Sequence, residues 1–424
     1  MLHRARLHRS WLDAPSARHD ADGFGLYDLE VIDRRVASIT PAVANGAHVE
    51  NDLRGRIVSP CFVDCHTHLD KGHIWHRRSN PDGTFAGALE AVAADRTANW
   101  TAEDVATRMQ FGLKCAHAHG TRAIRTHIDS DGPQDAISWP VFERLRAEWS
   151  GRIELQGACL QSIEKFREPG RLDALADRVA GAGGVLGAVA YMVPDIDELL
   201  DAVFAAAMKR GLALDFHADE TGEADARALH HIALAAIRHG YRDRILIGHC
   251  CSLARQPEAH VLETLDLVAR SGIDVVTLPL CNLFLQDRRT GPTTPRWRGV
   301  TLVHEMAERG INVCAASDNT RDPFYAYGDL DMLEVYRMAT RICHFDHPVG
   351  DWPRAVFANP ARAMGLDPVH GRIAAGEPAD LIIFAGRSWT ELLSRPEPDR
   401  VVVREGTVID RALPAYEELD HLME

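Results

Sequence analysis

The stretch Phe62-Val63-Asp64-Cys65-His66-Thr67-His68-Leu69-Asp70 begins with apolar residues and carries two histidines two positions apart near its end. Side chains at positions i and i+2 of a β-strand point to the same side of the sheet. We therefore expect a strand from Ser59 to His68 that presents both imidazoles at one place. A single metal ion could contact both rings there.

Seven further runs of apolar or β-branched residues follow this strand: Thr121 to Asp129, Arg152 to Leu160, Val185 to Met192, Leu212 to Ala218, Arg244 to His249, Ile273 to Pro279 and Ile311 to Asp318. Stretches with helical spacing lie between most of them, namely Ala102 to Ala118, Asp195 to Lys209, Glu223 to Arg238 and Val303 to Arg309. Eight strands that alternate with helices predict an α/β fold, a (β/α)8 TIM-like barrel.

Glycines mark the ends of several predicted helices, just before the next strand. They are Gly120, Gly211, Gly272 and Gly310. Glycine adopts the left-handed conformation that commonly terminates a helix, so the recurrence supports the alternating pattern.

The two chain ends differ from the middle. Leu26 to Val49 and Gly371 to Ile409 read as short β segments separated by turns. Neither end has enough apolar surface to fold alone. We expect residues 1–56 and 366–424 to form one composite small β domain, a β-sandwich, beside a catalytic barrel of residues 57–365.

Composition narrows the class of protein. The chain has 424 residues, and 46% of them are hydrophobic, but no stretch reaches the roughly 20 apolar residues of a membrane span. A net charge of −14 without a basic run disfavours nucleic acid as a partner and favours a small molecule. Met1 to Asp13 has no signal-peptide pattern, so we expect a cytoplasmic protein whose nine cysteines are reduced, most of them as small core residues.

Four predicted strands end in residues of metal-binding type. His217, His249 and Asp318 close the fifth, sixth and eighth strands, and His66 with His68 closes the first. A single histidine at a strand end is more often a hydrogen-bonded core residue. The joint pattern favours a metal site because the carboxyl ends of barrel strands share one rim. Imidazoles and a carboxylate suit one divalent metal ion, Zn²⁺ or Fe²⁺.

Glu220 lies three residues after His217, just beyond the predicted strand. This offset places a carboxyl group at the same rim of strand ends as His217 without making it a metal ligand. Such a position suits a general acid/base that moves protons between water and substrate. The alternative for such an acidic residue is capping of the following helix, and that role fits Asp219 better.

These motifs resemble the cytosine deaminase branch of the amidohydrolase superfamily, which includes N-alkylammelide amidohydrolases. The similarity extends from about residue 55 to about 410. It is carried by the Phe62–Asp70 stretch and by Arg125-Thr126-His127-Ile128-Asp129, Asp215-Phe216-His217-Ala218-Asp219-Glu220, Gly310-Ile311-Asn312-Val313-Cys314, Ser317-Asp318-Asn319, Asp322-Pro323-Phe324-Tyr325, Gly371-Arg372-Ile373-Ala374-Ala375-Gly376 and Ala379-Asp380-Leu381.

The resemblance implies roles for individual residues. His66, His68, His217 and Asp318 would hold one metal ion. His249 would lie beside the attacking water and take up its proton together with Asp318, Glu220 would shuttle protons, and Gln161 would hydrogen-bond the ring. Val185 to Met192 lacks the lysine that binuclear relatives carry, so one ion is expected. The resemblance also implies a homo-oligomer.

Three residues depart from the usual cytosine deaminase pattern: Asn319 replaces an aspartate, Phe324 replaces a tryptophan, and Lys71 follows His-Leu-Asp as in enzymes that act on triazines. The sequence leaves the role of Lys71 open. Phe324 and Trp75 could stack on a planar ring, although either could equally pack at the rim.

The sequence therefore leaves three possible functions open. The first is hydrolytic deamination of a cytosine-like pyrimidine or related nitrogen heterocycle, in which activated water attacks the amine-bearing carbon and ammonia leaves. The second is release of an alkylamine from a triazine-type ring. The third, an inactive metal-binding scaffold, is disfavoured because Glu220 and all four proposed ligands are present.

Overall fold

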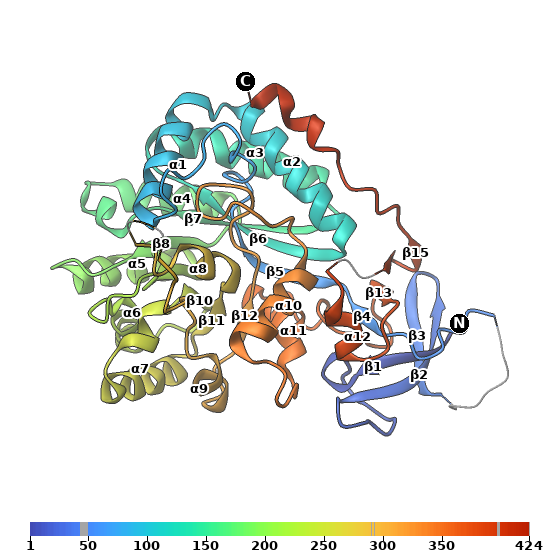
Figure 1. Ribbon diagram of the computed structural model, residues 1–424. Helices are drawn as coiled ribbons and strands as arrows, with labels where there is room; N and C mark the ends of the chain where they lie inside the picture. Colours follow the sequence, from blue (N-terminus) through green and yellow to red (C-terminus); the bar gives the residue numbers. More distant parts are fainter. Residues whose placement is uncertain (43–49, 290, 292, 397–398, 424) are drawn as a thin grey trace.

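The computed structural model describes residues 1–42, 50–289, 291, 293–396 and 399–423 (Figure 1). A strand forms in each of the eight predicted runs. In chain order these are β5 (Phe62–Thr67), β6 (Thr121–Asp129), β7 (Glu154–Leu160), β8 (Leu186–Ala190), β9 (Leu214–Ala218), β10 (Ile245–His249), β11 (Asp274–Thr277) and β12 (Val313–Ala315). The prediction of eight strands in these runs is confirmed.

These strands form two parallel sheets, ordered β5-β6-β7 and β8-β9-β10-β11-β12. Parallel bridges join the sheets on both sides. Ala158 bridges to Val185 between β7 and β8, and Thr67 bridges to Asp318 between β5 and the end of β12. The Asp318 N–H donates to the His66 carbonyl at 2.9 Å, so the first and last strands meet at the proposed metal ligands.

The first predicted strand is divided into two. β4 (Val58–Pro60) pairs with the C-terminal part of the chain, and β5 begins two residues later beside β6. Cys61 lies between them and donates its N–H to the Asp380 carbonyl, whereas the Phe62 N–H donates to the Gly120 carbonyl. The chain therefore changes sheets at Cys61, which the continuous apolar pattern did not indicate.

Helices follow most of these parallel strands, and further helices lie nearer the C-terminus. They are α1 (Phe85–Asn99), α2 (Ala102–His119), α3 (Asp135–Glu148), α4 (Arg171–Gly181), α5 (Ile196–Arg210), α6 (Ala228–Arg238), α7 (Glu258–Ser271), α8 (Pro279–Leu285), α9 (Val303–Glu308), α10 (Met332–Cys343), α11 (Ala358–Met364) and α12 (Trp389–Ser394). Gly120, Gly211 and Gly272 are left-handed caps as predicted, and Gly310, also with positive φ, follows α9.

Helix α6 starts at Ala228, five residues later than the helical spacing from Glu223 predicted. The Asp219 carboxylate explains this start, because its two oxygens accept the N–H groups of Ala228 at 2.8 Å and Leu229 at 3.0 Å. This contact confirms that Asp219 is the capping residue.

Two smaller antiparallel sheets come from the chain ends. One contains β1 (Leu2–His8), β2 (Phe24–Ile32) and β3 (Arg35–Pro41), and the other contains β4, β13 (Leu381–Phe384), β14 (Arg400–Arg404) and β15 (Thr407–Val408). Residues 43–49 of the predicted β region lie outside the described part. β1 was not predicted. Leu7, Tyr27, Val58, Leu381 and Val403 share one buried apolar cluster, so both chain ends contribute to it.

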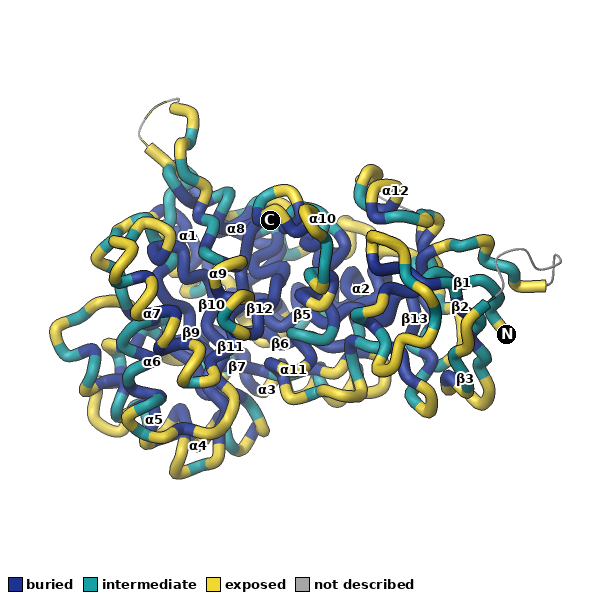
Figure 2. The backbone as a smooth tube through the Cα atoms, turned by 90° about the horizontal axis from the view of Figure 1, so that it is seen from below, coloured by how far each residue is buried: buried dark blue, intermediate teal, exposed yellow. Residues whose placement is uncertain are grey.

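Burial follows the layers of the fold. Every residue of β5, β9 and β10 is buried, whereas the helices that cover the strands are exposed on their outer sides (Figure 2). All nine cysteines are free and buried, as predicted. Within the described ranges, none of the helices combines the length and apolar composition that a membrane span requires.

Candidate active site

Parallel strands bring the predicted ligands to one rim. His66 lies on β5 with His68 just after it, His217 is on β9, His249 ends β10, and Asp318 follows β12. Each of these five residues is buried, with 0–6% of its surface exposed. Because these four strands run in the same direction, their carboxyl ends converge and the side chains meet.

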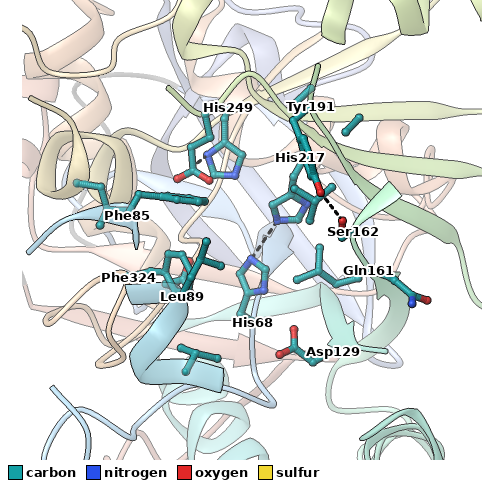
Figure 3. Close-up of a pocket in the computed structure, with 18 of the residues that line it drawn as sticks. His68, Phe85, Leu89, Asp129, Gln161, Ser162, Tyr191, His217, His249 and Phe324 are labelled. Atoms are coloured by element: carbon teal, nitrogen blue, oxygen red, sulfur yellow. Dashed lines mark hydrogen bonds and ion pairs between the residues drawn. The ribbon is translucent and has the colours of Figure 1, made fainter. Parts of the chain in front are cut away.

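The ligand atoms lie close together. His68 Nε2 is 3.2 Å from His217 Nε2 and 3.2 Å from Asp318 Oδ1, and His66 Nε2 is 3.5 Å from the same carboxylate oxygen. Figure 3 shows His68 and His217 pointing toward each other. Two imidazole nitrogens at this distance in a buried site suit a shared cation, since each can offer it a lone pair.

Unpaired buried atoms also fit a metal ion. Within the described chain, both ring nitrogens of His66, both oxygens of Asp318 and Nε2 of His249 are buried without a hydrogen bond. Burial holds the pKa of His66, His68 and His217 well below the ordinary value, so these imidazoles are neutral and can donate lone pairs. The donor set matches a borderline divalent ion such as Zn²⁺ or Fe²⁺.

Asp318 keeps its charge in this buried site. Burial opposes ionisation, but the neighbouring His68 and His249 leave the pKa of the Asp318 carboxyl below its usual value. The cluster therefore combines neutral nitrogen donors with one anionic oxygen donor.

His127 belongs to the same cluster, although no role was predicted for it from the sequence. It lies on β6, fully buried, and its ring centroid is 4.2 Å from that of His66 and 4.5 Å from that of His217. Its Nε2 is 3.0 Å from Asp215 Oδ1, and its Nδ1 is 3.3 Å from the Thr67 carbonyl oxygen. Its place near the end of the second predicted strand was the signal that could have revealed it.

Glu220 and His249 lie together beside the cluster. Glu220 Oε1 is 3.4 Å from His249 Nδ1, and Asn282 Nδ2 lies 3.0 Å from the same nitrogen and 3.4 Å from Glu220 Oε1. Burial, reinforced by the charge of Asp318, raises the pKa of Glu220 well above its ordinary value. A carboxyl group that holds its proton can serve as a proton donor. Asn282 is a second residue of this group that was not predicted from the sequence.

A cavity of about 720 Å³ opens over these residues. Its lining includes His68, His217, His249, Glu220 and Asp318. Phe85, Leu89 and Phe324 lie on one side of His68 in Figure 3, and Gln161 and Ser162 lie on the other. The cavity thus joins the ligand cluster to a largely apolar wall.

The predicted substrate contacts differ in position. Gln161, Asn319 and Phe324 line the cavity, whereas Trp75 is not among the lining residues and contacts Phe284 instead, with ring centroids 6.5 Å apart. Gln161 Oε1 accepts a hydrogen bond from Arg171 Nε at 3.0 Å.

Lys71 and Asn319 are held by acidic neighbours. Lys71 also lines the cavity, with its Nζ 3.3 Å from Asp129 Oδ1 and 5.2 Å from the centre of the Phe324 ring. Asn319 donates to Asp322 Oδ2 at 2.7 Å. Both side chains are therefore held in place by the protein itself.

Comparison with known proteins agrees with this geometry. A family model described as the amidohydrolase family matches residues 141–410. A pterin deaminase of Rhizobium rhizogenes is 51% identical over 401 residues, which cover 94% of this chain and 91% of that protein. An N-isopropylammelide isopropyl amidohydrolase of a Pseudomonas species is 24% identical, over 91% of this chain and 93% of that protein.

A solved structure of a deaminase has a similar fold. The crystal structure of a 5-methylcytosine deaminase from Klebsiella pneumoniae, liganded with 5-fluorocytosine, matches with a TM-score of 0.84 and 25% identity. The match covers 98% of each chain. The resemblance predicted from the sequence is confirmed, and the protein belongs to the amidohydrolase family, in a deaminase branch.

Proposed function

We propose that this protein is a metal-dependent hydrolytic deaminase of a fused 2-amino-4-oxo nitrogen heterocycle of the pterin type. The observation that carries the proposal is the 51% identity, over nearly the whole chain, to a pterin deaminase. The cavity volume of about 720 Å³ supports it, because the volume falls in the range of about 300–1,000 Å³ typical of small-molecule sites.

The reaction exchanges an amine for an oxygen. Water adds to the ring carbon that bears the amine, the carbon–nitrogen bond breaks, and a ring carbonyl and ammonia result. A divalent ion held by His66, His68, His217 and Asp318 would activate the water for this attack.

Residues of the chain would move the protons. Asp318 and His249 would accept the proton that the attacking water loses, and the unpaired Nε2 of His249 is placed for this exchange. Glu220 would protonate the ring nitrogen next to the reacting carbon and then the leaving nitrogen. Its raised pKa supports this role, because the group must hold a proton before the reaction.

Gln161, Asn319, Lys71 and Phe324 would orient the ring. Arg171 donates to Gln161 Oε1, so the Gln161 Nε2 amide remains as a donor for a ring oxygen or nitrogen. Phe324 and the opposing Phe85 offer aromatic surface, with centroids 5.5 Å apart in an edge-to-face arrangement. Trp75 would support the rim from outside the cavity.

We also propose that the eight parallel strands close into one barrel of residues 57–365 and that residues 1–56 and 366–424 form a composite β domain beside it. The bridges on both sides of the two sheets support closure. The apolar cluster shared by the two chain ends supports the composite domain.

The test is ammonia release from a panel containing pterin, cytosine, 5-methylcytosine, creatinine and N-isopropylammelide, with protein loaded with Zn²⁺ or Fe²⁺. Release from pterin that is lost in a Glu220→Gln variant is the expected result. Protein that holds metal but releases no ammonia from pterin would refute the pterin assignment. Isopropylamine release from the ammelide would instead favour the release of an alkylamine from a triazine-type ring. The 24% identity to an N-isopropylammelide isopropyl amidohydrolase supports that alternative.

A further inference from the structure

A second group of metal-binding residue types lies between helices α6 and α7, on the outer layer of the fold. His230 is in the first turn of α6, and His260 and Glu263 are in the first half of α7. Each residue offers one ligand atom, and the three atoms lie within 4.8 Å of one another. None of the three lines the active-site cavity.

The two imidazoles are held in place by one buried hydroxyl group. Thr264 Oγ1 lies 3.0 Å from His230 Nδ1 and 3.5 Å from His260 Nε2. A hydroxyl oxygen has two acceptor lone pairs and can accept an N–H from both rings. Each neutral ring then keeps one nitrogen with a free lone pair, which is the form that binds a metal ion.

The spacing allows closure around an ion. His260 Nδ1 and Glu263 Oε2 are 4.0 Å apart, and the Glu263 side chain is 64% exposed and free to adjust. In a tetrahedral site with zinc–ligand distances of about 2.0–2.2 Å, two ligand atoms lie about 3.3–3.6 Å apart. The three ligand atoms, which lie within 4.8 Å of one another, must therefore move closer together when the ion binds, and rotation of the exposed Glu263 side chain contributes to this closure.

Acidic and basic side chains both surround His230. Glu263 and Asp197 favour a cation at His230, whereas Arg227 and His231 oppose it. Burial, the largest influence, lowers the pKa of both His230 and His260, so both rings are neutral near pH 7.

We propose that His230, His260 and Glu263 form a second metal site, separate from the catalytic cluster, that binds a borderline dication such as Zn²⁺. Two imidazoles, one carboxylate and a water molecule complete the tetrahedral set that Zn²⁺ prefers. The site joins α6 to α7 one residue after Leu229, whose N–H donates to the capping carboxylate of Asp219 at 3.0 Å.

The test compares His230→Gln and His260→Gln with wild-type protein and with His231→Gln. His231 is the matched control, because it lies next to His230 but pairs with Asp197 of α5 at 3.1 Å. After dialysis against buffered Zn²⁺, the two test variants should each hold one equivalent of metal less than wild type and control, as measured by inductively coupled plasma mass spectrometry. Equal metal content in all four proteins would overturn the proposal.

A second measurement uses only the wild-type chain. Diethyl pyrocarbonate modifies accessible imidazoles, and peptide mass spectrometry locates the modified residues. Zn²⁺ should lower the modification of His230 and His260 several-fold and leave His231 unchanged. Identical modification with and without Zn²⁺ would refute the site, whatever the outcome of the deaminase assay.

Discussion

Gly248 determines how closely the His66 imidazole can approach strand β10. A Cβ atom at position 248 would lie 2.8 Å from His66 Cε1 and 3.2 Å from His66 Nδ1. Carbon atoms in contact ordinarily lie about 3.5–4.0 Å apart, so Gly248→Ala must displace the ring by at least ~0.7 Å. Gly248 is not among the residues with positive φ, so the effect comes from this contact and not from backbone strain.

A displacement of this size exceeds what the ligand cluster tolerates. Metal–ligand distances hold to about ±0.2 Å, and disturbing the support of a ligand typically weakens metal binding by about 10–100-fold. That loss corresponds to about 1.4–2.8 kcal/mol of binding free energy. Overpacking also lowers the free energy of unfolding by about 1–3 kcal/mol.

The assay measures metal content against free Zn²⁺ concentration, with deaminase activity at each point. Gly181→Ala is the matched control, because a Cβ at Gly181 meets nothing within 4 Å and the residue ends α4. The control should keep wild-type metal affinity. If Gly248→Ala binds Zn²⁺ within twofold of wild type and stays fully active, the assignment of His66 as a ligand held against β10 is wrong.

Three further predictions concern catalysis, metal and stability. Glu220→Gln should lower kcat by about 10²–10⁴-fold at unchanged metal content, and a parallel loss of metal would contradict a proton-transfer role. Chelation should abolish ammonia release while circular dichroism stays unchanged, and Zn²⁺ or Fe²⁺ should restore it; activity that survives verified metal removal would exclude metal dependence. Burial opposes the charge of Asp331, but Arg400, whose Nη1 donates to it at 2.8 Å, lowers the pKa of Asp331 to about 2. The stabilisation from this lowered pKa is complete above about pH 4 and disappears as pH falls toward 2. Asp331→Asn should cost about 3–5 kcal/mol of unfolding free energy at pH 7 in urea denaturation, and the difference should shrink at low pH.

Periodicity and strand ends predicted most of the site. The eight parallel strands and the glycines Gly120, Gly211 and Gly272 follow from local patterns, because alternation and helix caps are properties of neighbouring residues. The same reasoning located His66, His68, His217 and Asp318, since the carboxyl ends of parallel strands share one rim. The residues of β1 carried too weak an alternation of apolar and polar residues to be predicted as a strand. The change of sheets at Cys61, between β4 and β5, depends on pairing partners more than 300 residues away.

The amino-acid sequence by itself determined the alternation of strands and helices, the residue types at the rim and the family. Only the tertiary structure decided that His127 and Asn282 join the cluster, that Trp75 lies outside the cavity and that His230 meets His260. Contacts of this kind depend on how helices and strands distant in the chain pack together. Local spacing limits which way a side chain points but does not determine which distant residue it meets.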